Sequence, residues 1–218
     1  MLAKLKDTEL YYEVSGNGAP LLLIHGNGED HTIFDAVMPE LSEHFTVYAV
    51  DSRGHGKSAP CAHFDYGEMA EDFAQLIDVL SLEKPMLYGF SDGGIIGILL
   101  ASRHPELLSK MVISGANITP DGLTDDWINE FERMYRESGD DKLKMVLEQP
   151  NIPVSDLEKI TIPVLVTAGS DDMIREEHTR MIAAHISDSK LVIYEGEDHL
   201  SYVVHSAKML PALLEFLK

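Results

Sequence analysis

The chain has 218 residues, of which 44% are apolar and 25% are charged, and this composition predicts one folded globular domain and excludes a disordered chain. Its formal net charge of −20 repels phosphate backbones and anionic lipid surfaces, and no cluster of Lys and Arg offsets it, so we expect no nucleic-acid or membrane partner. The same acidity disfavours strongly anionic substrates unless a Lys or Arg near the site reverses the local field.

The cysteine usage and the N-terminal stretch both bear on the compartment. The single cysteine, Cys61, excludes an internal disulfide framework and is typical of a reducing cytoplasm. The first residues alternate between apolar and polar and have no continuous apolar core, so we predict a strand there and no signal peptide. No apolar run is long enough to cross a bilayer. We therefore expect a cytoplasmic protein.

Strand patterns recur along the whole chain. Residues 2–5 and 10–14 alternate around a turn and predict an antiparallel hairpin at the start of a sheet. Six short aliphatic runs bounded by turn residues are typical of strands buried on both faces of a parallel sheet. These runs are 21–24, 45–50, 86–90, 111–114, 164–168 and 191–194.

Helical patterns fill the intervals between these strands. Apolar residues three and four apart over 69–80 predict a helix that packs on the sheet. A second, almost wholly apolar helix is expected from just after Ser91 to about His104. The last helix has a leucine stripe over 210–217, where Pro211 is expected to kink or restart it. The alternation predicts an α/β protein with a mostly parallel eight-stranded sheet and helices on both faces.

One segment interrupts this alternation. Residues 117–153 contain no convincing strand but two amphipathic helical patterns, which we interpret as a small helical cap inserted after the sixth strand. The cap aromatic residues Trp127, Phe131 and Tyr135 supply the apolar face that docks it. We expect one or two of them to line a substrate pocket as well.

The strongest local motif is G-F-S-D-G-G at residues 89–94, between a predicted strand and a predicted buried helix. A serine at such a sharp turn has a strained backbone, and the flanking glycines are needed because side chains there would clash. We therefore predict that Ser91 is a nucleophile at the carboxyl edge of the sheet. The alternative is a Gly-rich turn in which the serine caps the helix.

A serine nucleophile needs a base and an acid elsewhere in the chain, because its hydroxyl is a poor nucleophile until its proton is removed. His199, in the loop after the strand at 191–194, is the candidate base. Asp172, just after the strand at 164–168, is the candidate acid that orients the histidine. All three residues follow the carboxyl ends of strands, where open α/β sheets place their sites.

Taken together, these motifs resemble the α/β-hydrolase superfamily over nearly the whole chain. Three further segments carry the resemblance in the right order, namely H-G-N-G at 25–28, D-S-R-G-H-G-K-S at 51–58 and I-P-V at 162–164. The family pattern places the acid three residues after a glycine, which favours Asp172 over its alternative, Asp171. The resemblance also implies an oxyanion hole formed by the backbone N–H groups of Asn27 and Asp92.

The resemblance implies acyl transfer in two steps on Ser91, with no metal or organic cofactor. We predict a carboxylesterase-like serine hydrolase that acts on a small-molecule ester or related acyl compound. Because residue 91 is not an aspartate, the haloalkane dehalogenase and epoxide hydrolase branches are disfavoured. The alternatives are a carbon–carbon bond hydrolase or perhydrolase with the same three residues, a non-catalytic ligand-binding receptor, and an interaction module that uses the acidic surface.

Overall fold

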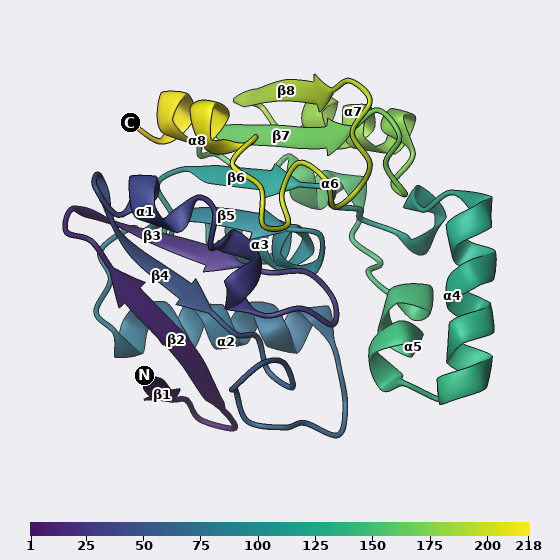
Figure 1. The fold of residues 1–218 in the computed structure, drawn as a ribbon, viewed down its shortest axis with the longest axis horizontal. Coiled ribbons are helices and arrows are strands. Elements are labelled where there is room, and N and C mark those ends of the chain that lie inside the picture. The colour runs from purple at the N-terminus through teal and green to yellow at the C-terminus, as the bar shows by residue number, and fades with distance from the viewer.

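The predicted strands form one eight-stranded sheet in a computed structural model that describes residues 1–218 (Figure 1). The strands are β1 (Leu2–Lys4), β2 (Glu9–Ser15), β3 (Ala19–Ile24), β4 (Phe45–Val50), β5 (Met86–Phe90), β6 (Met111–Ser114), β7 (Val164–Gly169) and β8 (Ser189–Tyr194). Their order across the sheet is β1-β2-β4-β3-β5-β6-β7-β8. β2 is antiparallel to both of its neighbours, and every other pairing is parallel. The predicted mostly parallel sheet of eight strands is confirmed.

Different helices cover the two faces of this sheet, because successive side chains of a strand point to opposite faces. In β3, Leu22 and Ile24 belong to one apolar core and Leu21 and Leu23 to the other, and all four are fully buried. The first core includes side chains of α2 (Tyr66–Val79), α3 (Asp92–Arg103), α6 (Val154–Leu157) and α7 (Glu176–His185). The second includes side chains of η1 (His31–Phe34), α1 (Met38–Leu41) and α8 (Leu210–Leu217). Burial on both faces explains why these strands lack polar alternation in the sequence.

The helix ends follow local chemistry. At the start of α2, the carboxylate of Asp65 accepts a hydrogen bond from the N–H of Glu68, which is a standard N-cap. Pro211 lies in the first turn of α8, where its missing N–H is tolerated, so this helix begins at Leu210 and is not kinked by the proline. None of the helices combines the length and the hydropathy needed to cross a bilayer.

Between β6 and β7 the chain leaves the sheet and forms η2 (Pro120–Gly122), α4 (Asp125–Ser138) and α5 (Asp141–Glu148). These helices stand beyond the carboxyl ends of the parallel strands, at the right of the view in Figure 1. No residue of α4 is buried, and its main packing partner is α5. This is the segment expected to form a small cap, and it faces the sheet edge where the predicted site residues lie.

Candidate active site

Ser91 occupies the sharp turn between β5 and α3 that its glycine-rich motif predicts. Its φ of 52° and ψ of −114° lie in a region that non-glycine residues rarely adopt. A Cβ atom on Gly93 would lie only 2.1 Å from the carbonyl oxygen of Ile24, so this turn requires a glycine at that position. Although Ser91 immediately precedes α3, its side chain makes no capping hydrogen bond. Its hydroxyl is therefore free for another partner, unlike that of a helix-capping serine.

That partner is His199, in the loop between β8 and α8. Ser91 Oγ lies 3.0 Å from His199 Nε2, and His199 Nδ1 lies 2.6 Å from Asp172 Oδ1. A carboxylate only accepts hydrogen bonds, so Nδ1 donates to Asp172 and the Nε2 lone pair faces the serine hydroxyl. The three predicted side chains thus form one continuous hydrogen-bonded path along which a proton can pass from Ser91 to His199.

Asp172 is held by its own backbone surroundings. Its Oδ1 atom accepts a second hydrogen bond from the N–H of Ile174 at 2.9 Å. Asp172 and His199 are 8% and 5% exposed, so little water competes for the bond between them. Asp171, the alternative acid, is exposed and makes no hydrogen bond with His199. Of the two candidate acids, Asp172 is therefore the one whose carboxylate contacts His199.

The two predicted oxyanion-hole residues, Asn27 and Asp92, line the same cavity as Ser91. The N–H of Asp92 opens α3 and so has no acceptor within the helix, and that of Asn27 has no backbone acceptor. The Asp92 carboxylate is turned elsewhere, since it accepts hydrogen bonds from Asn27 Nδ2 at 2.9 Å and from the Tyr66 hydroxyl at 2.6 Å. Burial raises the pKa of Asp92, and these two hydrogen bonds oppose that rise.

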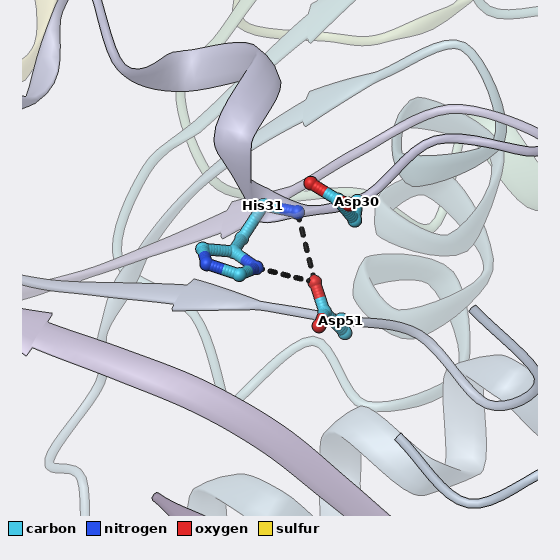
Figure 2. A group of neighbouring side chains, drawn as sticks. All are labelled: Asp30, His31 and Asp51. Carbon is cyan, nitrogen blue, oxygen red and sulfur yellow. Dashed lines mark hydrogen bonds and ion pairs between the residues drawn. The ribbon is translucent and has the colours of Figure 1, made fainter. Parts of the chain in front are cut away.

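A buried carboxylate braces the two loops next to this site. Asp51 accepts hydrogen bonds from the N–H and Nδ1 of His31, at 2.8 and 2.7 Å (Figure 2). It also accepts one from the N–H of Lys57 at 2.8 Å. Asp30 accepts from the N–H and hydroxyl of Thr32. The side-chain atoms of Asp30, His31 and Asp51 that could ligate a metal ion are close enough together to hold one. Because protein groups already engage them, we interpret the cluster as a structural brace.

A cavity of about 310 Å³ opens over Ser91 and His199, between the sheet edge and the cap. One or two of the three candidate cap aromatic residues were expected to line a pocket, and only Phe131 lines this cavity. Trp127, which is 40% exposed, packs on the Phe131 ring with centroids 5.6 Å apart, and Tyr135 also lies outside the lining. The prediction for those two residues is therefore corrected. The other apolar cap residues in the lining are Leu123, Met134, Leu143 and Val146.

Several polar cavity residues were not singled out by the sequence, among them Tyr66 and Glu29. Tyr66 begins α2, and its hydroxyl donates a hydrogen bond to Asp92. Glu29 lies in the loop after β3, two residues beyond Asn27. Neither belongs to a recognisable motif, although Glu29 lies directly after the H-G-N-G segment. Their position in the site depends on how α2 and the loop after β3 pack together.

Comparisons with known proteins agree with this arrangement. A family model described as alpha/beta hydrolase fold matches residues 19–136. The human serine hydrolase BPHL is 30% identical, over 88% of this chain and 77% of that protein. A pimeloyl-[acyl-carrier protein] methyl ester esterase of Neisseria meningitidis is 24% identical, over 90% and 92%.

The fold also recurs among solved structures. The enol-lactonase from Burkholderia xenovorans LB400 superposes with a TM-score of 0.83 at 21% sequence identity, over 100% of this chain and 99% of that one. Other relatives are much longer than the matched region, since the chain covers only 33% of a Mycobacterium tuberculosis protein and 36% of a Bacillus subtilis protein.

Proposed function

The chain belongs to the α/β hydrolase family, and on that premise we propose that it is a serine hydrolase that cleaves small carboxylic esters through an acyl-enzyme on Ser91. The observation that carries this proposal is the hydrogen-bonded path from Ser91 through His199 to Asp172. Its three members come from loops after β5, β7 and β8, so the sheet itself supplies their alignment.

In the first step, Ser91 Oγ attacks the ester carbonyl carbon while its proton passes to His199 Nε2. The carboxylate of Asp172 stabilises the positive imidazolium that forms. The carbonyl oxygen becomes negative, and the N–H groups of Asn27 and Asp92 stabilise it by about 3 kcal/mol per donor. When the C–O bond breaks, His199 gives its proton to the leaving alkoxide, and the acyl group remains on Ser91.

In the second step, a water molecule attacks the acyl-enzyme and gives its proton to His199 Nε2. The same backbone N–H groups stabilise the second tetrahedral intermediate. Collapse of that intermediate releases the carboxylic acid, and the proton returns to Ser91 Oγ. The enzyme is thereby regenerated with all of its protons in place.

The size and lining of the cavity support a small substrate. Its volume of about 310 Å³ lies at the lower end of the roughly 300–1,000 Å³ typical of ligand pockets. The apolar cap residues in its lining favour a short aliphatic acyl or alkyl group. Two similar proteins are named as a methyl ester esterase and an enol-lactonase, which supports an ester bond as the target.

The one free thiol, Cys61, supports a cytoplasmic location.

A fluorophosphonate probe combined with an ester series tests the proposal. We expect the probe to label the wild type and not Ser91→Ala or His199→Ala, and short-chain p-nitrophenyl esters to be hydrolysed best. A thermal shift with ligands but no labelling would instead favour a receptor. Faster turnover of a vinylogous diketone than of any ester would favour carbon–carbon bond hydrolysis.

A further inference from the structure

Glu29 places a carboxylate beside the nucleophile. It lies between β3 and η1 and lines the cavity. Its Oε2 atom accepts a hydrogen bond from the N–H of Gly26 at 2.9 Å. A Cβ atom on Gly26 would lie 2.6 Å from that oxygen and 3.1 Å from Ser91 Cβ. The carboxyl group and the nucleophilic residue therefore flank the same glycine.

The titratable groups around Glu29 include one histidine, two acids and one buried tyrosine. They are His199, Asp92, Asp30 and Tyr88. Of these groups, only His199 can carry a positive charge. No Lys or Arg forms an ion pair with Glu29, and its Oε1 atom accepts no hydrogen bond from the protein. The ionised carboxylate of Glu29 in the cavity lining is thus not paired with any Lys or Arg.

Lys142 is the one Lys or Arg in the cavity lining, and its side chain contacts other groups. Lys142 Nζ lies 3.6 Å from Asp140 Oδ1 and 5.2 Å from the centroid of the Phe64 ring. Asp140, which also lines the cavity, offsets the charge of this lysine. The positive charge of Lys142 is therefore not available to attract an anionic substrate into the cavity of this acidic protein.

Burial also brings the charge of Glu29 under the control of pH. Loss of hydration raises the pKa of this carboxyl group from 4.5 to about 7, against the opposing effect of the Gly26 hydrogen bond. The cavity wall beside Ser91 therefore changes from negative to neutral as the pH falls through neutrality.

We propose that Glu29 is a specificity-determining residue that excludes substrates carrying a carboxylate close to the scissile ester and admits their neutral counterparts. The inference rests on the proposed hydrolase function. Like charges a few ångströms apart in a partly desolvated site repel strongly enough to change kcat/KM by about tenfold or more. The repulsion acts only while the Glu29 carboxyl group is ionised.

A pair of matched methyl esters tests this inference. Monomethyl succinate carries a carboxylate where methyl 4-methylpentanoate carries an isopropyl group, so the two differ mainly in charge. Methanol release is measured for both between about pH 5.5 and 8.5, a range in which the succinate carboxylate, with a pKa near 4.5, stays largely ionised. The ratio of the two kcat/KM values cancels any pH dependence of the reaction that is common to both substrates.

In the wild type we expect the ratio of anionic to neutral substrate to rise about tenfold as the pH falls through 7. In Glu29→Gln we expect a high ratio that does not depend on pH, because the glutamine oxygen still accepts the Gly26 hydrogen bond but carries no charge. Asp35→Asn is the matched control, since Asp35 is an exposed carboxylate outside the cavity lining. That variant should keep the wild-type ratio at every pH.

A wild-type ratio that is flat with pH, or an equal ratio in wild type and Glu29→Gln, would overturn the inference while leaving the hydrolase function intact. If the wild type hydrolyses neither ester, the proposed function fails instead. Charge selection is then measured as the ratio of Kd values for 4-methylpentanamide and succinamate. An unchanged Kd ratio in Glu29→Gln would overturn the inference on its own.

Discussion

The central strands of the sheet and the cap helix α4 differ sharply in how they are stabilised. Every residue of β5 and β7 is buried, whereas α4 has no buried residue at all. Helix α4 relies in part on local ion pairs, such as those of Arg133 with Glu130 and Glu137, which contribute only a few tenths of a kcal/mol each. Ser91 and Asp172 follow these fully buried strands, whereas His199 follows the edge strand β8, which has no buried residue. The cap contributes chiefly to the shape of the cavity.

The largest expected effect is on the tightly packed side of this comparison. Asp172→Asn should lower kcat for p-nitrophenyl butyrate by about 10⁴-fold, because an amide in this position favours the wrong tautomer of His199. Asp171→Asn is the matched control and should keep wild-type activity, since Asp171 makes no hydrogen bond with the histidine. Equal losses in both variants would contradict the assignment of the acid. Thermal unfolding of each variant checks that the fold is retained.

Stability should divide between the two regions in the same way. Ile96, in α3, is fully buried, and Ile96→Ala should lower the free energy of unfolding by about 2–5 kcal/mol through a cavity in the core. Trp127→Ala, on the exposed cap helix, should lower it by less than about 1 kcal/mol despite the larger side chain removed. Urea denaturation measures both. Similar losses would mean that the cap is an integral part of the cooperative fold.

A smaller effect is expected on substrate binding by the cap. Phe131→Ala should raise KM for p-nitrophenyl butyrate by about five- to tenfold with little change in kcat, because it removes apolar contact made equally in the ground and transition states. Trp127→Ala removes a side chain of the same helix that packs on Phe131 but does not itself line the cavity, so its KM should change less. A larger effect from Trp127→Ala would show that the outer aromatic residue, and not Phe131, controls the pocket.

The smallest expected effect concerns stability and pH. In the folded protein the pKa of Glu29 is about 7 instead of 4.5, so between these values the unfolded chain has released a proton that the folded chain keeps. Wild-type stability contributed by this group is full below pH 4.5 and is lost as the pH rises through 7. Glu29→Gln lacks this loss. Its Tm relative to wild type should therefore be higher at pH 8 than at pH 5, by several degrees.

Sequence periodicity was sufficient wherever an element was long or buried on both faces. The apolar spacing over 69–80 predicted α2, and the unbroken aliphatic run at 86–90 predicted β5. The short helices η1, α1 and α6 were not predicted, because three or four residues contain about one turn and no repeating pattern. Helix α7 was anticipated only as a solvated helix face at residues 176–178, and its extent was not predicted, since its apolar stripe is weak beside its charged residues.

The sequence alone determined the fold class and the three residues of the hydrogen-bonded path. Parallel strands end at one edge of the sheet, so knowing which strand each of Ser91, Asp172 and His199 follows was enough to predict that they meet. Only the tertiary structure decided that Phe131 and not Trp127 or Tyr135 reaches the cavity, and that Glu29 stands beside Ser91 with a raised pKa. Those features depend on contacts and desolvation between segments far apart in the chain, and no local pattern of residues encodes them.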